Sequence, residues 1–309
     1  RHGIFPDGGL GILAMGKYGG RELTHTSDLD VVFLYHCEDM NSMSDGERPL
    51  APSKYFSRLG QNVITAITAH TAEGSLFEVD TRLRPSGTAG PLVVTLKTFA
   101  DYYSQAAWTW EHMALTRARL VVCPEKLAKP LMETIIDTLS AHRDKENLIK
   151  RVAEMRQKLV DQFSTDDIWS LKHTRGGLID MEFICQYLML REGNKIKGLF
   201  SPILDNAFDK LEEHAILPKG AAQKLKHAHR VQQTIQSMLR LCLGDVKFYE
   251  ATFSSGLKFL LAKSCGFEEI EDLKSELRLC QADVSHYYQS IIASPAENQN
   301  NQNEVENDT

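Results

Sequence analysis

The stretch that decides the fold is GKYGGRELTHTSDLDVVFLY, residues 16–35. It joins a glycine pair, Gly19 and Gly20, to two aspartates, Asp28 and Asp30, and it ends in a run of β-branched and aromatic residues. Such a run predicts a buried strand. Because side chains alternate along a strand, the two aspartates lie on one face while their apolar neighbours point into the core.

This combination indicates a site that handles phosphates. Two converging carboxylates repel each other, and a hard divalent cation such as Mg²⁺ neutralises them. A glycine pair lets the backbone approach a phosphate and present its N–H groups. Lys17, beside the glycines, has two interpretations: a phosphate contact or a solvated lysine. Neither G-x-x-x-x-G-K-[ST] nor G-x-G-x-x-G occurs here.

A third carboxylate lies in EVDTRLRP, residues 78–85, within a strand predicted over residues 75–83. By the same alternation, Asp80, Arg82 and Arg84 share one face of this strand. Three aspartates and two arginines suit phosphoryl-group chemistry: two carboxylates hold metal ions, Asp80 orients or deprotonates a hydroxyl, and an arginine meets phosphate charge. The alternative is that the arginines are solvated charges that block edge pairing.

The rest of the chain divides into two patterns. Before residue 124, short apolar runs predict strands near 9–15, 30–36, 75–83 and 91–96, with a helix within 52–70. Beyond about residue 140, helical spacing predicts an antiparallel bundle from the segments 146–163, 179–193, 201–216, 219–244 and 268–292. We therefore predict an α+β protein with a sheet domain (1–124), an all-α helical bundle domain (125–293) and a disordered tail (294–309).

Composition narrows the functional classes. The net charge of the 309 residues is −6, and the last 13 residues carry four acids, which leaves −2 on the rest. A nearly neutral body disfavours nonspecific nucleic-acid binding. No apolar stretch is long enough for a membrane span and no secretory signal is visible, which favours the cytoplasm. The six cysteines are too scattered to indicate a zinc site, and His227 and His229 face different sides of a predicted helix.

Four strings together resemble one known family. They are GKYGGRELTHTSDLDVVFLY, FEVDTRLRPSGTAGPLV, AWTWEHMALTRARLV and GGLIDMEFICQYL. The sequence resembles the glutamine synthetase adenylyltransferase family, within the nucleotidyltransferase superfamily of the DNA polymerase β type. That family's bifunctional enzyme adds AMP to, and removes it from, a tyrosine of glutamine synthetase. The resemblance runs from about Gly9 to at least Leu190, and loosely to about Ile292.

The resemblance implies a nucleotidyltransferase fold for the sheet domain and particular roles for its motif residues. Asp28, Asp30 and Asp80 become the metal-binding and catalytic carboxylates. The residues implied or predicted to contact the nucleotide are Gly19, Gly20, Ser27, Arg82, Arg84 and Lys17. The implied reaction is attack by the tyrosine oxygen on the α-phosphate of ATP, with Mg²⁺ as cofactor and pyrophosphate as leaving group. Glutamine synthetase and the PII signalling protein are the implied partners.

The family's protein carries two such units in tandem, and this chain carries one, so we expect it to be a fragment. The segments LYHCEDMNSMSDGER and RPSGTAG, the latter with Ser86 and Thr88, resemble the C-terminal, adenylylating unit. Two alternatives remain open. One is phosphorolytic removal of AMP from the same tyrosine, giving ADP, and the other is a non-catalytic module that binds nucleotide or PII.

A second glycine pair opens the helical part in RGGLIDMEF, residues 175–183. Asp180 and Glu182 follow it in the first turns of a predicted helix. The helix macrodipole favours acids there, so capping is one explanation. Because the family repeats this string in both units, contact of Asp180 or Glu182 with the nucleotide or the target tyrosine is the other.

Overall fold

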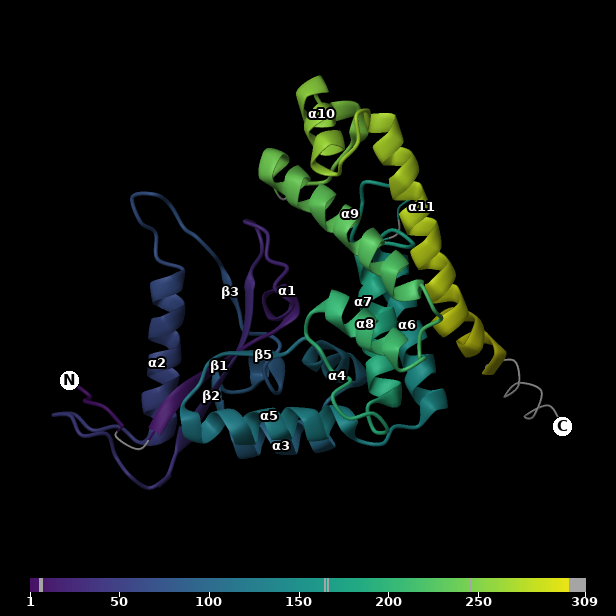
Figure 1. Ribbon diagram of the computed structural model, residues 1–309. Coiled ribbons are helices and arrows are strands. Elements are labelled where there is room, and N and C mark those ends of the chain that lie inside the picture. Colours follow the sequence, from purple (N-terminus) through teal and green to yellow (C-terminus); the bar gives the residue numbers. More distant parts are fainter. Residues whose placement is uncertain (6–7, 164, 166, 245, 300–309) are drawn as a thin grey trace. The chain divides into compact units, whose positions relative to one another are not determined.

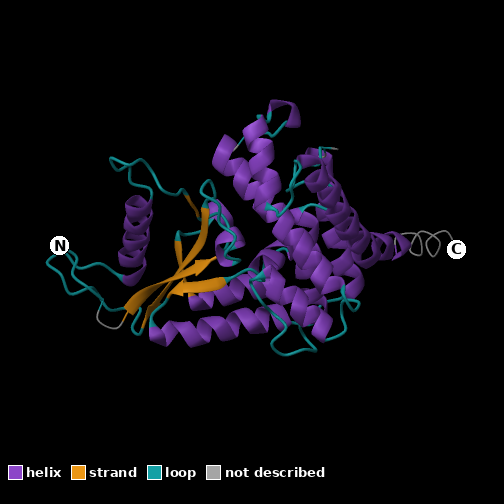
Figure 2. Ribbon diagram, turned by 45° about the horizontal axis from the view of Figure 1, so that its top comes forward, coloured by secondary structure: helices purple, strands orange, loops and turns teal. Residues whose placement is uncertain are grey.

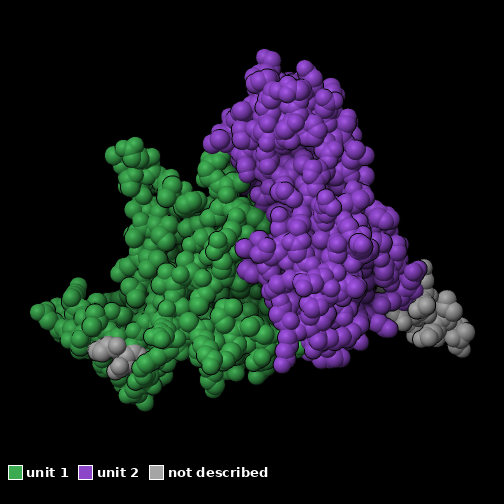
Figure 3. Space-filling view, viewed as in Figure 1, with its two compact units in different colours: residues 1–141 green, residues 142–309 purple. Residues whose placement is uncertain are grey.

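The computed structural model describes residues 1–5, 8–163, 165, 167–244 and 246–299. The chain forms two compact units, Arg1–Ala141 and His142–Thr309, which Figure 3 colours separately. Each unit buries its own set of apolar side chains. Among the described residues, no helix combines the length and the apolar character that crossing a membrane requires.

The first unit is built on a five-stranded sheet with β2 (Leu29–Cys37) at its centre (Figure 2). Strand β1 (Gly8–Ala14) pairs antiparallel with β2 on one side and with β5 (Arg119–Val122) on the other. Strands β3 (Val79–Asp80) and β4 (Val93–Thr95) pair parallel with β2, β3 at its start and β4 further along. This mixed sheet with its helices confirms the predicted α+β class.

Both faces of β2 are covered, which explains its nearly continuous apolar run. On one face, α2 (Pro52–Ile67) packs so that the Phe56 ring stacks on Tyr35 with 4.9 Å between centroids. On the other face, Leu34 is fully buried, and helices α3 (Leu96–Gln105) and α5 (Glu125–Ser140) contact the strand. The predictions for β1, β2 and the helix within 52–70 are confirmed.

Helix α5 (Glu125–Ser140) was not predicted, and it decides where the first unit ends. The helix contacts α3, α4 (Thr109–Leu115) and β2. Its buried residues recur at helical spacing and are Leu127, Leu131, Ile135 and Leu139. Figure 1 shows α3 and α5 lying together along the sheet. The sequence placed the boundary near residue 124, whereas the two compact units part after Ala141 because α5 packs on the sheet.

The strand expected over residues 75–83 is mostly wrong. Only Val79 and Asp80 pair with β2, and turns follow from Arg82 onward. Consequently Asp80, Arg82 and Arg84 do not alternate along one strand, and the alternation that placed both arginines beside Asp80 does not apply. A strand forms only where its backbone groups pair with those of a neighbouring strand. Only two residues of β2 pair with β3, and residues further along β2 pair with β4 instead.

The described residues of the second unit form helices and no strands. The helices are α6 (Lys145–Phe163), α7 (Leu178–Glu192), α8 (Leu204–Glu213), α9 (Ala221–Leu243), α10 (Ser255–Ser264) and α11 (Ile270–Tyr288). All were predicted except α10. Residues 294–299, assigned to the disordered tail, are helical, and Ala296 is buried. The rest of that predicted tail, residues 300–309, lies outside the described residues.

Candidate functional site

Two of the three predicted carboxylates meet at the edge of the sheet where β2 begins. The register of the parallel pair places Asp30 directly opposite Asp80, and the N–H of Leu29 donates to the carbonyl of Glu78 at 2.8 Å. Neighbouring strands lie about 4.8 Å apart, and residues opposite each other point to the same face. The two carboxylates, 50 positions apart in sequence, are therefore neighbours.

The third carboxylate borders the same hollow. Asp28 immediately precedes β2 and is exposed to solvent. Together with Asp80 it lines an open hollow of about 320 Å³, whose other walls are Glu78, Val79, Thr81 and Arg82. The sequence placed Asp28, Asp30 and Asp80 in one site, and the structure brings all three to this edge.

Arg82 lies among these aspartates. Its Nε donates to Asp80 Oδ2 at 2.8 Å, and its backbone N–H donates to Asp80 Oδ1 at the same distance. Partial burial acts to raise the pKa of Asp80, but the hydrogen bonds and charge of Arg82 outweigh it and hold the pKa below its ordinary value. The hydrogen bond and charge of Asp80, followed by the charges of Asp30 and Asp28, raise the pKa of Arg82. One exposed guanidinium therefore balances part of the charge of three carboxylates.

Arg84 has a different environment from Arg82. It is buried, and its Nη1 donates to the carbonyl of Thr81 at 2.8 Å, while its Nε donates to the carbonyl of Pro91 at 3.1 Å. These bonds connect the two ends of the turn region that follows β3. Ser27 is buried as well, and its hydroxyl accepts from the N–H of Thr24 at 2.9 Å. The side chains of Arg84 and Ser27 therefore stabilise the loops next to the aspartates.

The glycine pair is required by close contacts within the fold. Helix α1 (Gly16–Gly19) carries the first glycine, and a Cβ on Gly19 would lie 1.9 Å from the carbonyl oxygen of Arg117. A Cβ on Gly20 would lie 2.0 Å from Arg117 Nη2, which instead pairs with Glu22 at 2.6 Å. In this structure the close approach that the sequence assigned to a phosphate is made by Arg117.

A neighbouring arginine holds the same segment from β5. Arg119 Nε donates to the carbonyl of Gly19 at 3.0 Å and its Nη2 to that of Tyr18 at 2.8 Å. Its guanidinium also lies 5.4 Å from the centre of the Tyr18 ring. Arg117 and Arg119 thus fix the α1 segment, which contains Lys17, against the sheet.

Gly16 is the glycine nearest to a predicted carboxylate. Its φ is +48°, in the left-handed region that favours glycine, and a Cβ there would lie 2.5 Å from Asp30 Oδ2. The N–H of Met15 donates to the backbone carbonyl of Asp30 at 2.9 Å. The sequence prediction overlooked Gly16, Glu22, Arg117 and Arg119, although the alternation of the two arginines in LTRARLV was a usable signal.

Asp180 belongs to the second unit and is fully buried there. Its Oδ1 accepts from Arg156 Nε at 2.5 Å, and its Oδ2 accepts from the N–H of Gly176 at 2.6 Å. Both side chains of the ion pair have 0% exposure. Glu182, two residues further on α7, is partly exposed. The two acids predicted together therefore have different environments, and Asp180 carries an internal bonding role.

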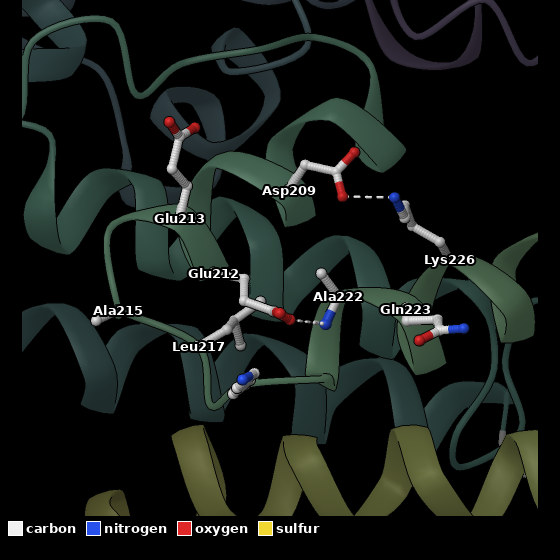
Figure 4. A pocket seen from close by; sticks show the side chains of 9 residues that line it. Asp209, Glu212, Glu213, Ala215, Leu217, Ala222, Gln223 and Lys226 are labelled. Carbon is white, nitrogen blue, oxygen red and sulfur yellow. Dashed lines mark hydrogen bonds and ion pairs between the residues drawn. The ribbon is translucent and has the colours of Figure 1, made fainter.

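Larger hollows occur in the second unit, but their chemistry is less suited to a reaction. One of about 520 Å³ lies at the turn between α8 and α9, where Asp209 pairs with Lys226 and Glu212 accepts from the N–H of Ala222 at 2.7 Å (Figure 4). Another, of about 880 Å³, is lined by Trp169 and residues around it. The convergence of three carboxylates, rather than volume, selects the sheet edge as the candidate site.

The donor set at the sheet edge suits a hard cation. Asp28, Asp30 and Asp80 offer only carboxylate oxygens, and no cysteine or histidine lines the hollow that Asp28 and Asp80 share. Oxygen ligands of this kind favour Mg²⁺ over softer metals. An anion carrying several negative charges would also meet the guanidinium of Arg82 there.

Comparisons with known proteins find similarity for both parts of the chain. Residues 5–134 match the family model described as Glutamate-ammonia ligase adenylyltransferase. Residues 146–292 match the one described as GlnD PII-uridylyltransferase. The first match contains every candidate residue of the sheet edge, and the second covers the helices from α6 to α11.

Curated relatives match nearly the whole chain. The bifunctional glutamine synthetase adenylyltransferase/adenylyl-removing enzyme of Rhodopseudomonas palustris is 37% identical over 281 residues, or 91% of this chain and 28% of that protein. The enzymes of the same name from Bradyrhizobium diazoefficiens and Xanthobacter autotrophicus are each 36% identical over 96% of this chain and 30% of their own length. The resemblance drawn from the motifs is confirmed, and the chain spans less than a third of these relatives.

Proposed function

We propose, from the similarity of this chain to bifunctional glutamine synthetase adenylyltransferase/adenylyl-removing enzymes, that it transfers AMP from ATP to a tyrosine of glutamine synthetase and releases pyrophosphate. The observation that carries the proposal is the register that places Asp30 opposite Asp80, with Asp28 beside them. In this proposal the first unit is a nucleotidyltransferase domain of the polymerase β type, and the second is its helical bundle.

The aspartates divide the chemistry between them. Asp28 and Asp30 would hold Mg²⁺, and Asp80 takes the proton of the tyrosine hydroxyl. The bound metal supplies positive charge that stabilises the nucleophile and the leaving group. The tyrosine oxygen forms a bond to the α-phosphorus as the bond from that phosphorus to pyrophosphate breaks. Arg82 lowers the pKa of Asp80 and so weakens it as a base, and the departure of Arg82 would restore the basicity that proton transfer needs.

Arg82 changes partner in this scheme. Its guanidinium bonds to Asp80, and its side chain is 74% exposed. An incoming triphosphate offers it a more highly charged acceptor, so Arg82 turns to the phosphates and uncovers the carboxylate. Arg117 and Arg119 act indirectly, because they hold the α1 segment with Gly16 and Lys17 beside Asp30.

Two other functions have specific support. The names of the relatives include an adenylyl-removing activity, so phosphorolysis that returns ADP is the second candidate at the same carboxylates. The similarity of residues 146–292 to a PII-uridylyltransferase supports a PII-binding role for the second unit. We assign this chain to the adenylylating, C-terminal unit on the segments LYHCEDMNSMSDGER and RPSGTAG.

The test measures transfer of AMP from α-labelled ATP to purified glutamine synthetase in the presence of Mg²⁺. Asp30→Asn and Asp80→Asn keep the side-chain size and remove the charge, and we expect each to lower the rate at least about 100-fold. Asp101→Asn, at an exposed position on α3, removes the same charge away from the sheet edge and should leave the rate unchanged.

The outcomes separate the candidates. Labelled glutamine synthetase that depends on Asp30 and Asp80 supports adenylylation. Release of ADP from pre-adenylylated enzyme on addition of phosphate, without forward transfer, replaces it with the removal reaction. If neither reaction occurs and the second unit alone accounts for PII binding, the chain is a regulatory module and the proposal is wrong.

A further inference from the structure

Helices α9 and α11 bring three metal-binding side chains together far from the sheet edge in sequence. The helices pack side by side (Figure 1), and His227 on α9 faces Glu276 and Cys280 on α11. Glu276 and Cys280 are four residues apart, so they lie on one face of α11 in successive turns. One ligand atom from each of the three residues lies within 4.8 Å of the others.

A single carboxylate oxygen now links the other two donors. Glu276 Oε1 lies 2.6 Å from His227 Nε2 and 3.6 Å from Cys280 Sγ, so two hydrogen bonds to this oxygen connect the three side chains. The ligands of a tetrahedral zinc ion lie about 2.0–2.3 Å from it, and hence about 3.5 Å from one another. Small rotations of these side chains would bring the three donors to that spacing around a common centre.

The surroundings also suit a cation. The cluster borders a hollow of about 220 Å³ that is lined by Lys224 and Asp283 as well. Lys224 Nζ pairs with Asp283 at 3.0 Å, so these two charges compensate each other and Glu276 supplies a net negative charge. Cys280 is buried while His227 is exposed, which gives the site a protected sulfur and an open side for entry.

We propose that His227, Glu276 and Cys280 form a Zn²⁺ site that joins α9 to α11, with solvent as the fourth ligand. A set of imidazole nitrogen, carboxylate oxygen and thiolate sulfur suits zinc and excludes Mg²⁺, which requires oxygen ligands. On binding, the Cys280 thiol loses its proton to solvent and the thiolate coordinates the ion. The scattered cysteines concealed this site in the sequence, because His227 and Cys280 lie 53 positions apart.

The test uses metal alone as the probe, on the whole chain after removal of metals with a chelator. Zn²⁺ is titrated against a chromophoric chelator in excess Mg²⁺, which occupies the carboxylates of the sheet edge. Co²⁺ then replaces Zn²⁺, because a cobalt–thiolate bond gives a near-ultraviolet charge-transfer band that carboxylates do not give. We expect one ion per chain, with His227→Ala and Cys280→Ser each weakening binding at least about tenfold.

The matched control is Cys123→Ser, which removes a partly buried thiol from the first unit. It should keep both the affinity and the charge-transfer band, whereas Cys280→Ser should lose the band. Because His227 is exposed, His227→Ala tests the site without disturbing the core, and circular dichroism verifies its helices. A band that survives Cys280→Ser, or native protein that binds no zinc under these conditions, overturns the proposal.

Discussion

Two aspartate–arginine pairs of the same chemistry occupy opposite environments. Asp80 and Arg82 meet at the edge of the sheet, where the side chains are 13% and 74% exposed. Asp180 and Arg156 meet inside the second unit, where both are 0% exposed. The sequence marked both aspartates as site candidates, yet only the first pair has a partner that can leave for another anion.

The two pairs differ because burial determines whether a charged side chain can exchange its partner for water or another ion. Both oxygens of Asp180 accept bonds inside the protein, and Arg156 Nη2 donates to the carbonyl of His173 at 3.1 Å. A buried charge that loses its partner has no water to replace it. The Arg82 side chain is 74% exposed to solvent, so it can exchange partners at little cost.

Asp180→Ala should produce the largest effect. It leaves the charge of Arg156 buried without its carboxylate, and breaking such a pair costs about 3–5 kcal/mol. It also removes the acceptor for the N–H of Gly176, whose φ of +74° already restricts this turn. Chemical denaturation should show this loss in the free energy of unfolding.

Asp80→Ala is the matched comparison, since it removes the same side chain from the pair at the sheet edge. It should lower the free energy of unfolding far less, because Arg82 is already solvated. Equal losses in the two variants would mean that burial does not distinguish the pairs. A destabilised Asp180→Ala chain that refolds when Arg156 is also replaced by Met would strengthen the comparison.

Gly20→Ala should have the next largest effect, because it disturbs another ion pair, that of Arg117 and Glu22 in the first unit. The added Cβ would meet Arg117 Nη2, which must move away from Glu22. Overpacking of this kind costs about 1–3 kcal/mol. Gly256→Ala on α10 is the control, since its nearest contact lies at 3.9 Å. It should be neutral or stabilise the chain by up to about 1 kcal/mol, and thermal unfolding of both variants tests the contrast.

The sequence predicted those helices, strands and motifs whose residue pattern lies within one short segment. The apolar run of β2 and the spacing on α2 were visible, and so was the Asp28–Asp30 pair. Helix α5 was missed even though its leucines recur at helical spacing, since Pro124 precedes it and Pro130 lies inside it. Prolines usually end helices, and here the packing of α5 on the sheet outweighs that preference.

The remaining features of the site depend on contacts between residues that are far apart in the sequence. The site needs Asp80 opposite Asp30, and nothing in residues 75–83 reveals that only Val79 and Asp80 pair with β2. The Arg117–Glu22 pair joins residues 95 positions apart, so the reason for the glycine pair was hidden as well. Arg84 and Asp180 carried the right chemistry for a site, but their burial is a property of the folded chain.

The surroundings of the buried pair predict a pH effect of intermediate size. Burial, followed by the charges of Lys172 and Arg156, lowers the pKa of His173 from 6.5 to about 4. Between these values the unfolded chain binds a proton that the folded chain does not, so stability falls as pH drops from 6.5 to 4. Denaturation midpoints across this range should show the decline for the native chain.

His173→Gln should flatten that decline, because glutamine cannot be protonated. Replacing the exposed His214 in the same way should leave the slope as it is. An unchanged slope in His173→Gln would mean that protonation beside Arg156 is tolerated, and that the surroundings of the buried pair are less restrictive than the structure indicates.

Arg82→Gln should change stability least, and this is what separates the two pairs most clearly. The side chain is exposed and hydrated, so the denaturation midpoint should stay within experimental scatter of the native value. Binding should respond instead, because the positive charge of Arg82 lies beside Asp28 and Asp30 and opposes a cation there: calorimetric titration should show tighter Mg²⁺ binding in the variant. Lys97→Gln, an exposed charge change on α3, is the control for nonspecific electrostatics. A large loss of stability in Arg82→Gln would instead place this arginine with Arg156, as a residue that the fold cannot release.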